Sequence, residues 1–438
     1  MGQHSHACVL VILMNRRADF LAQRRLALTM GSDLRGVTSA DTCFNFALAG
    51  VQHSSGLFQT LSCIGVHELR RAGHRASFRP KNILHMVEKF AAADVNALDL
   101  YHLAAVCLEK KGHNDSTLIK SLKFGRFGLH CDRPLLWLWR HSSRQKKLSI
   151  DYFTSKSKDR GKINWDEIFE DASKPLVVDL GSGLGSSLLN LSTLSNSHGS
   201  EIVDSNHCVD SLQMVWSEIN YVGADLNQAL VNFGLGIISR STQRRGRVHF
   251  LCLSAEDLLH ELQSYPGKLA LIMINFPSPY RLEVGNLAGN SQLPGKHSFM
   301  VTKNILRSIA ELLAENSSPN RGDTSEGMFL FQTKCEDVAV HVMNECISLG
   351  TMECVPCKYP MEDVDLEYAK RGKRPKRVEE WLKATPLARA EGIMYSQMSL
   401  LFAFGRPETE VQCNYDNILV HRCLFRRRHV APRRRQQK

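Results

Sequence analysis

Apolar and polar positions divide the chain into a helical first part and an alternating second part. Between Pro80 and Lys111 the apolar side chains recur at helical spacing, with a break near 94–96, which predicts two helices. From Leu176 onward, short apolar runs alternate with longer amphipathic stretches. Strands are expected at 176–180, 220–224, 248–252, 269–274 and 327–332, and helices near 185–194, 226–240, 255–263, 300–315 and 335–347. This alternation predicts an α/β domain whose parallel sheet carries helices on both faces.

The remaining segments give a four-part organisation. We expect a leader over 1–75, a helical accessory segment with a basic linker over 76–162, the α/β domain over 163–405 and a basic C-terminal tail over 406–438. The first eighty residues are rich in arginine, contain no lysine and hold few acids. Such a composition is typical of organelle transit peptides, and a poorly ordered extension is the alternative. Mitochondrion, plastid, cytoplasm and nucleus all stay open as locations.

Charge and cysteine content narrow the class of partner. The chain of 438 residues has a formal net charge of +11 and a hydrophobic fraction of 43%. Its cations cluster at Lys370, Arg371, Lys373, Arg374, Lys376 and Arg377, and again at Arg426, Arg427, Arg428, Arg433, Arg434, Arg435 and Lys438. Such clusters suit a polyanion, most simply nucleic acid. The apolar run 7–14 is too short to span a bilayer.

Two smaller features receive structural interpretations. Among thirteen cysteines only Cys354 and Cys357 form a close pair, and a zinc ribbon needs two such pairs, so no metal site is expected. Reduced thiols in an intracellular compartment are the expectation. Trp137 and Trp139 alternate as in a strand and could stack on bases, although burial against the helical segment is the more common fate.

A glycine loop follows the first expected strand. The run 176–180 ends in Leu180 just after Asp179, and glycines follow at alternate positions, Gly181, Gly183 and Gly185. Glycine permits positive φ angles and close approach of a ligand to the backbone. The spacing is not that of dinucleotide binding, because position 186 is serine. The loop resembles motif I of class I methyltransferases, which bind S-adenosylmethionine (AdoMet).

Acidic residues stand at the next two strand ends. Asp225 follows the second strand, where a carboxylate typically holds a ribose hydroxyl pair, and residues 195–217 look like an insertion before it. Residues 251–259 fit the third strand end, where adenine is normally contacted. Each acid alone would more often cap a helix. Together with Asp179 they form a series that favours AdoMet.

The fourth strand ends in Asn275-Phe276-Pro277-Ser278-Pro279, a stiff loop that presents its middle residue. Here the chain resembles the bacterial-type tRNA (guanine-N7-)-methyltransferase family, whose loop reads Asn-Phe-Pro-Asp-Pro-Trp. The run 329–339 is similar to that family's next strand and helix, and 386–391 is a fainter echo of its C-terminal substrate loop. The resemblance covers about residues 163–405 and implies a Rossmann-like methyltransferase sheet.

The resemblance also implies site residues. Its catalytic positions are Asn275, Pro277, Ser278 and Pro279. Its cofactor-binding positions are Asp179, Gly181, Gly183, Gly185, Asp225, Ser254, Ala255 and Glu256. Its substrate-binding positions are Arg281, Thr333, Lys334, Arg389 and Glu391. The chain departs from the family at three acids, which are replaced by Ser278, Ser254 and Lys334.

Two functions therefore stay open. The first is AdoMet-dependent methylation of guanine N7 in tRNA, with or without a non-catalytic partner subunit and with no membrane association. The second is a weak or inactive RNA-binding protein on the methyltransferase fold. A third hypothesis, methylation of another substrate, is supported only by the glycine loop, which is common to many methyltransferases. Glu256, Glu283, Glu336 and Asp337 are candidates to replace the missing acids.

Overall fold

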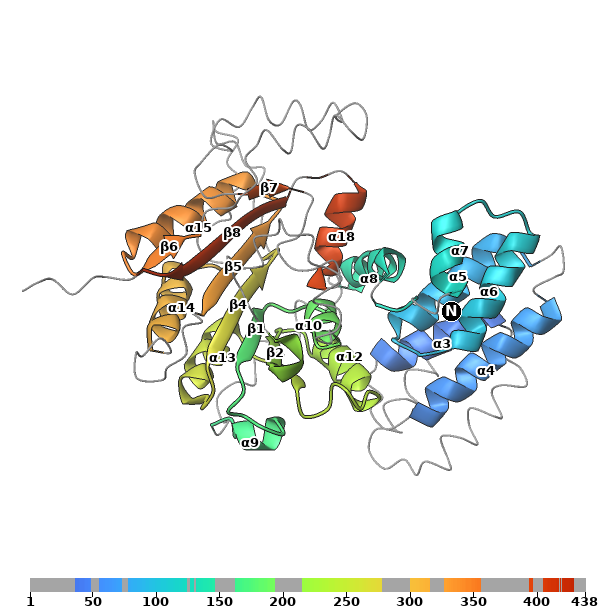
Figure 1. Ribbon diagram of the computed structural model, residues 1–438, viewed down its shortest axis with the longest axis horizontal. Coiled ribbons are helices and arrows are strands. Elements are labelled where there is room, and N and C mark those ends of the chain that lie inside the picture. Colours follow the sequence, from blue (N-terminus) through green and yellow to red (C-terminus); the bar gives the residue numbers. More distant parts are fainter. Residues whose placement is uncertain are drawn as a thin grey trace, which may run out of the picture.

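The computed structural model shows an α/β domain joined to a helical region (Figure 1). The residues it describes are 36–48, 55–72, 78–123, 127–129, 131–145, 162–193, 215–277, 300–315, 327–355, 394–396, 405–416, 418 and 420–428. The two parts lie at opposite ends of the view in Figure 1 and meet at a shared apolar core. The expected fold class, a Rossmann-like sheet preceded by helices, is confirmed.

In the part of the chain that the structure describes, eight strands form one sheet. They are β1 (Leu176–Leu180), β2 (Asn220–Ala224), β3 (Val248–Leu251), β4 (Leu269–Asn275), β5 (Met328–Thr333), β6 (Met352–Cys354), β7 (Met394–Ser396) and β8 (Val420–Arg427). Their order is β3-β2-β1-β4-β5-β8-β6, with β7 paired to β8 outside this path. Strands β1 to β5 are parallel, whereas β8 runs antiparallel to β5 and β6. The five strands expected from the sequence are these parallel ones.

The chain reverses its direction of travel across the sheet between β1 and β4. It passes from β1 outward to β2 and β3, then returns to pair β4 with the other side of β1. Ligands of such sheets bind beyond the carboxyl ends of the strands at this switch point. The glycine loop after β1 and the asparagine at the end of β4 are therefore neighbours, as expected.

Helices cover both faces of the sheet. On one face lie α10 (Ser186–Leu191) and α12 (Gln228–Ser239), and on the other α13 (Ala255–Glu261), α14 (Lys303–Glu315) and α15 (Glu336–Ser348). Alternate residues of β1 serve the two faces, because Val177 belongs to the first core and Val178 to the second. A short helix, α9 (Trp165–Ile168), precedes β1, and α18 (Glu408–Tyr415) precedes β8.

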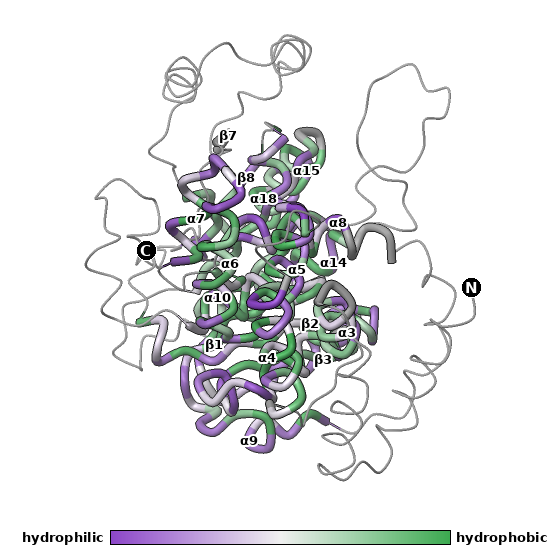
Figure 2. The backbone as a smooth tube through the Cα atoms, turned by 90° about the vertical axis from the view of Figure 1, so that its right-hand side faces the viewer, coloured by the Kyte–Doolittle hydropathy of each residue, from purple (hydrophilic) through white to green (hydrophobic). Residues whose placement is uncertain are grey.

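Six helices of the helical region lie within the described residues. They are α3 (Gly36–Leu48), α4 (Ser55–Ala72), α5 (Pro80–Ala92), α6 (Leu98–Lys110), α7 (Ser116–Lys123) and α8 (Asp132–Gln145). Helices α5 and α6 are the expected pair, with Pro80 at the start of the first. Figure 2 looks onto this end of the molecule, where hydrophobic and hydrophilic residues alternate along the helices. This is the pattern of helices that bury one side.

Two expectations for the first part of the chain need correction. Residues 36–72 lay within the expected leader, but α3 and α4 bury Phe44, Phe58 and Leu61 in the same core as α5 and α6. Burial of these large side chains makes both helices part of the folded protein. Residues 1–35 lie outside the described residues. Trp137 lies on helix α8, not on a strand, and packs edge-on against Phe44 with ring centroids 4.2 Å apart.

The expected C-terminal boundary is also wrong. The sequence predicts a basic tail over 406–438, yet α18 and β8 lie within this range, and β8 occupies the position between β5 and β6. Four apolar residues of β8 outweigh its arginines, because Val420, Cys423, Leu424 and Phe425 are buried in the sheet. Arg426 instead pairs with Glu353 on β6. The α/β domain therefore extends to Arg427.

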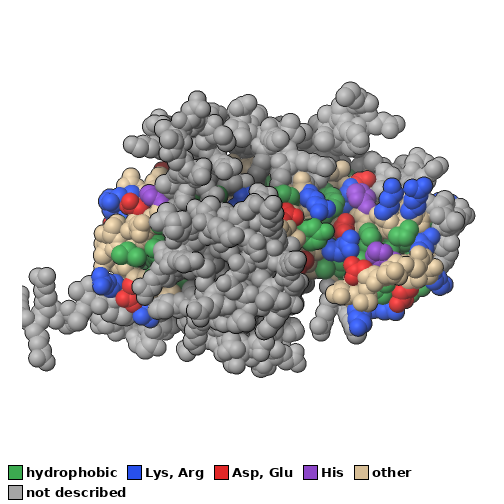
Figure 3. Space-filling view, turned by 90° about the horizontal axis from the view of Figure 1, so that it is seen from above, with side chains coloured by type: hydrophobic (Ala, Val, Ile, Leu, Met, Phe, Trp, Pro, Cys, Tyr) green, Lys and Arg blue, Asp and Glu red, His purple; other side chains and the backbone are tan. Residues whose placement is uncertain are grey.

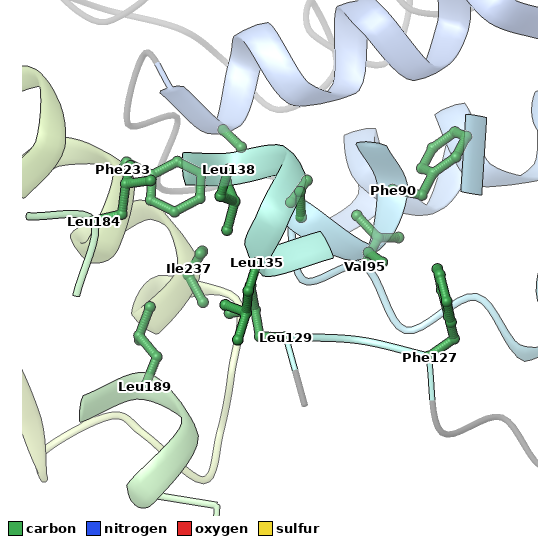
Figure 4. Packing of buried hydrophobic residues seen from close by; sticks show 14 of the residues in the cluster. Phe90, Val95, Phe127, Leu129, Leu135, Leu138, Leu184, Leu189, Phe233 and Ile237 are labelled. Carbon is green, nitrogen blue, oxygen red and sulfur yellow. The ribbon is translucent and has the colours of Figure 1, made fainter. Parts of the chain in front are cut away.

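The helical region is fastened to the helices beside the glycine loop. Figure 4 shows Phe233 and Ile237 of α12 and Leu189 of α10 facing Leu135 and Leu138 of α8. Two arginines that follow α12 add polar contacts between the helical region and the α/β domain, and both reach the turn between α5 and α6. The Arg240 Nη2 group donates to the Ala93 carbonyl at 2.7 Å, and Arg244 forms an ion pair with Asp94.

Arg244 also contacts the helix that follows the glycine loop. Its Nε donates to the Leu189 carbonyl of α10 at 3.1 Å. Asn190 of the same helix donates its amide to the Leu129 carbonyl at 3.1 Å. Asp94 adopts a φ of 53°, a rare conformation for a residue with a side chain, and its carboxylate meets the buried Arg244 guanidinium. The helical region thus supports α10 directly.

Candidate active site

The glycine loop wraps tightly around the end of β1. Gly181, Gly183 and Gly185 have φ angles of 78°, 59° and 74°, in the region that favours glycine. The N–H groups of Gly181 and Ser182 both donate to the Ala224 carbonyl at 2.8 Å, which fastens the loop to the end of β2. A Cβ atom on Gly185 would lie 2.1 Å from the Phe250 ring. The sequence-predicted glycines are therefore required by the turn itself.

Asp225 joins the first two strand ends. Its carboxylate accepts the Gly183 N–H at 3.0 Å through Oδ2 and the Asn227 N–H at 2.8 Å through Oδ1. Leu226, the next residue, has an exposed fraction of 62%. The structure therefore places an acid and an exposed apolar side chain beside the glycine loop. This pair offers hydrogen-bond acceptance and an apolar surface to a nucleoside.

The third strand end holds Ser254, Ala255 and Glu256, which were predicted to contact the cofactor. Ser254 is the N-cap of α13, since its Oγ accepts the Asp257 N–H at 3.0 Å and donates to the Asp257 carboxylate at 2.7 Å. Ala255 is buried and Glu256 is exposed. The Ser254 side chain thus has a structural role at the position where the related family carries an acid.

Asp179 lies under the loop, almost fully buried with 1% of its surface exposed. Burial raises its pKa to about 7, and the nearby carboxylates of Glu408 and Asp225 act in the same direction, while a hydrogen bond from Asn275 opposes them. The Asn275 Nδ2 donates to the Asp179 Oδ1 at 3.1 Å. This hydrogen bond links the glycine loop of β1 to the predicted catalytic loop after β4.

The loop after β4 begins with a strained residue. Phe276 has a φ of 51°, and its N–H donates to the Gln332 carbonyl of β5 at 2.8 Å. This conformation turns the chain sharply at the end of β4, just before Pro277. Of the predicted catalytic positions, Asn275 and Pro277 are described, whereas Ser278 and Pro279 lie outside the described residues. Arg281, Arg389 and Glu391 of the predicted substrate positions also lie outside them.

The remaining predicted substrate positions stand at the end of β5. Thr333 is buried, and its Oγ1 accepts the Cys335 N–H at 3.2 Å, next to the start of α15. Lys334 is half-buried. The side chains of Glu336 and Asp337 lie outside the described part. Thr333 therefore turns the chain at the same edge of the sheet as Asn275, but its hydroxyl is already engaged.

Sequence reasoning missed four polar residues near Asn275 and Asp179. Gln332 on β5 donates its Nε2 to the Asn275 Oδ1 at 2.7 Å, and the Arg422 Nε on β8 donates to the Gln332 Oε1 at 2.9 Å. Arg422 also pairs with Glu410 of α18, and Glu408 stands near Asp179. A Gln in an otherwise apolar strand and an Arg inside the run 420–425 are the signals that the sequence offered.

Within the described residues no group of three or more His, Cys, Asp or Glu side chains is placed to hold a metal ion. Cys354 lies near two buried thiols, Cys346 and Cys423, whose pKa values are raised by burial first and by the charge of Cys354 second. Cys357 lies outside the described residues. None of the helices that the structure describes is long and apolar enough to cross a membrane.

The geometry matches the strand order and loop positions of class I methyltransferases. No protein-family model matches the chain. It is similar to the tRNA (guanine-N(7)-)-methyltransferase of Lactobacillus johnsonii, with 25% identity over 119 residues, which is 27% of this chain and 43% of that protein. The enzyme of the same name from Lactobacillus gasseri is 24% identical over the same shares. This similarity confirms the resemblance to that family, and the match spans less than half of the relatives' length.

The similarity of the chain to solved structures is weaker than its similarity to these two enzymes. A putative class I S-adenosylmethionine-dependent methyltransferase from Listeria monocytogenes aligns with 11% identity, 81% of this chain, 89% of that chain and a TM-score of 0.28. A Rickettsia typhi protein, PKMT2 in complex with AdoHcy, aligns with 16% identity, 61% of this chain, 52% of that chain and a TM-score of 0.25. Scores of this size say nothing of ligand or substrate.

Proposed function

We propose that the protein transfers a methyl group from AdoMet to N7 of a guanine in tRNA. The observation that carries this proposal is the Asn275–Asp179 hydrogen bond, 3.1 Å long, at the switch point of the sheet. It joins a loop of the donor-binding kind to the Asn-Phe-Pro loop of the tRNA (guanine-N7-)-methyltransferase type. The partial similarity to two enzymes of that name supports the same substrate.

The donor half fits AdoMet. AdoMet supplies an activated methyl group on a sulfonium. Three glycines with positive φ expose the backbone of the loop, and Asp225 at the end of β2 has a carboxylate positioned beside Gly183. Asp179 and Glu408 add negative charge near the loop, which complements a cationic ligand. Leu226, exposed next to Asp225, offers an apolar contact to a base.

The acceptor half must orient the guanine more than activate it. Guanine N7 carries an available lone pair, so methylation needs no prior removal of a proton. Alignment of two reactants can contribute about 7–11 kcal/mol to catalysis. The rigid turn at Phe276, held by its N–H bond to Gln332, fixes where the loop enters the site. An acid at position 278 would therefore increase the rate of methylation but is not required for it.

The basic segments supply the contacts to the tRNA backbone in this proposal. The cluster 370–377 and the residues after Arg427 lie outside the described part, and their role rests on charge alone. Figure 3 shows Lys and Arg side chains on the helical end mixed with Asp and Glu, so that end is not a uniformly basic surface. We therefore assign the main phosphate contacts to the clusters and not to helices α3–α8.

A second function has a specific motivation. The replacement of three family acids by Ser278, Ser254 and Lys334 is what an RNA-binding protein with weak or no activity would carry. Ser254 is committed to capping α13, so it cannot replace the lost acid. This alternative keeps the tRNA as a partner and removes the reaction.

Two measurements on the purified full-length protein distinguish the methyltransferase function from the RNA-binding alternative. Calorimetry measures AdoMet binding, and incubation with AdoMet and bulk tRNA, followed by nucleoside mass spectrometry, measures N7-methylguanosine. The proposal expects binding and product, with Asp225→Ala as a control in which AdoMet affinity and product yield are both reduced. Binding of AdoMet and tRNA without product would favour the second function. Absence of AdoMet binding would contradict the first.

A further inference from the structure

A row of buried polar side chains crosses the sheet from the donor loop to the C-terminal strand. In order they are Asp179 on β1, Asn275 on β4, Gln332 on β5, Arg422 on β8 and Glu410 on α18. All five are at most 9% exposed, and Gln332, Arg422 and Glu410 are fully buried. Each neighbour in the row is joined to the next by a side-chain hydrogen bond or ion pair. Polar groups at this depth are stabilised only when such bonds are complete.

The chemistry of Arg422 fixes the direction of every bond in the row. A guanidinium has only donors, so the Gln332 side chain must turn its Oε1 toward Arg422. The Gln332 amide nitrogen then faces Asn275 and donates to its Oδ1 at 2.7 Å. The Asn275 amide nitrogen is consequently the group left to face Asp179, to which it donates at 3.1 Å.

We propose that Arg422 is a positioning residue of the active site, which orients the Asn275 amide toward Asp179 through Gln332. Arg422 touches neither reactant, and it acts on the junction between the donor loop and the Asn-Phe-Pro loop. Glu410 balances its charge inside the core, since an unpaired guanidinium there would be costly. Strand β8 therefore takes part in the site, although β4 and β5 lie between it and β1, the strand that precedes the glycine loop.

Reversal of the hydrogen-bond direction in the row would raise the pKa of Asp179. If Gln332 turned its amide nitrogen away from Asn275, Asn275 could present its oxygen to the Asp179 carboxylate. Two oxygens in contact require a proton between them, so Asp179 would hold its proton to higher pH. The other charged groups that act on Asp179 are Glu408 of α18 and Asp225, which directly follows β2, and neither belongs to the row.

Three variants distinguish an effect of hydrogen-bond direction in the row from an effect of added charge. Arg422→Lys keeps a donor-only cation beside Gln332 and Glu410. Gln332→Glu has nearly the same shape, still accepts from Arg422, and cannot donate to Asn275, so it reverses the row. Gln332→Met adds no charge and leaves Asn275 without a fixed direction. Gln332→Met and Gln332→Glu both retain the Arg422–Glu410 ion pair, which limits the risk of unfolding.

The first readout is the titration of the Asp179 carboxyl in the full-length protein without ligand. Infrared difference spectroscopy follows the protonated carboxyl band, and Asp179→Asn identifies it. Wild type is expected to titrate near about 7. Arg422→Lys should titrate as wild type does. Gln332→Glu should raise the midpoint by about one unit or more, a tenfold change in proton affinity, and Gln332→Met by less.

Two results would overturn the inference. In one, Gln332→Met titrates like wild type, so that any shift in Gln332→Glu comes from its added charge alone. In the other, Arg422→Lys shifts the midpoint of the Asp179 titration as far as Gln332→Glu does. Arg422 would then not control the direction of the hydrogen bonds in the row, because lysine is also a donor only. If Gln332→Glu does not fold, the comparison of Gln332→Met with Arg422→Lys decides the matter by the same criteria.

A second readout rests on the proposed function. AdoMet affinity of Gln332→Met, measured by calorimetry, should fall several-fold at neutral pH and recover above the raised midpoint, while Arg422→Lys follows wild type. Loss of affinity at every pH alike would indicate a merely structural role and overturn the inference. Failure of wild type to bind AdoMet would contradict the proposed function, and the carboxyl titration would still test the row.

Discussion

The donor half and the acceptor half of the site are built in different ways. The proposed donor half consists of two short segments, 181–185 and 224–227, that bond to each other through the Ala224 carbonyl and the Asp225 carboxylate. The acceptor half depends on side chains from β4, β5, β8 and α18, which are far apart in sequence. A donor site can thus be kept by a few local residues, whereas the acceptor site requires the whole sheet to be in register.

Gly185→Val should have the largest effect and fall on the donor half. The residue has a φ of 74°, and a Cβ there would meet the Phe250 ring. Backbone strain and overpacking together predict a loss of about 3–5 kcal/mol in the free energy of unfolding. Gly183→Ala is the matched control, since its φ of 59° is similar and no atom lies within 4 Å of its added Cβ. Urea denaturation of both measures the difference, and equal losses would contradict the packing argument.

Asp179→Asn should change how stability depends on pH. Burial raises the Asp179 pKa from 3.8 to about 7, so the folded state binds its proton more tightly than the unfolded chain. Its stabilising contribution is complete below pH 3.8 and is lost as pH rises through about 7. At about 1.4 kcal/mol per pKa unit, the loss amounts to a few kcal/mol. Denaturation at several pH values should show this fall in wild type relative to Asp179→Asn, and parallel curves would refute it.

Asp225→Ala should weaken donor binding more than it weakens the fold. The substitution removes the acceptor of the Gly183 and Asn227 N–H groups and the acid beside the proposed ribose. We expect AdoMet affinity to fall about 10–100-fold, as for the loss of a charge-assisted hydrogen bond. Asp225→Asn keeps an oxygen for Gly183 and should fall less. Calorimetry on the two variants measures this order, and its reversal would argue against a role for the carboxylate charge.

Ser278→Asp should act on the acceptor half alone. It restores the acid that the related family carries in the proline loop and should raise the rate of tRNA methylation by about tenfold, a modest share of what single electrostatic groups contribute. AdoMet affinity should be unchanged, because the residue belongs to the acceptor loop. Ser278→Asn is the neutral control. A change in AdoMet affinity with no change in rate would place position 278 in the donor half instead.

The sequence predicted the local parts of the fold well. All five parallel strands, the glycine loop and the α5–α6 pair follow from periodicity and from Gly and Pro positions. Strand β8 was missed because the consecutive arginines at its end resemble a solvated tail, and only its place between β5 and β6 makes Arg422 a buried residue. Helices α3 and α4 were missed because arginine-rich composition outweighed their apolar positions, whose value depends on α5 and α12 packing against them.

The same distinction holds for the site. Asp179, Asp225 and the three glycines could be named from local spacing, because each lies in or shortly after an expected strand, although their hydrogen bonds join distant residues, Gly183 to Asp225 and Asn275 to Asp179. The row Asn275–Gln332–Arg422–Glu410 could not, because its members come from residues up to 147 positions apart and depend on strand register. Ser254 was predicted as a cofactor contact, and the structure shows it capping α13. A short polar residue at a strand end can serve either purpose, and only the hydrogen bonds distinguish them.

The central claim is that this site methylates guanine N7 in tRNA. Its most direct test is mass spectrometry of tRNA from cells with and without this gene, read for N7-methylguanosine and repeated with Asp225→Ala in place of the wild type. The account predicts that the modified nucleoside falls in at least one tRNA without the gene, returns with wild type and does not return with Asp225→Ala. Identical N7-methylguanosine in all tRNAs under the three conditions would contradict it.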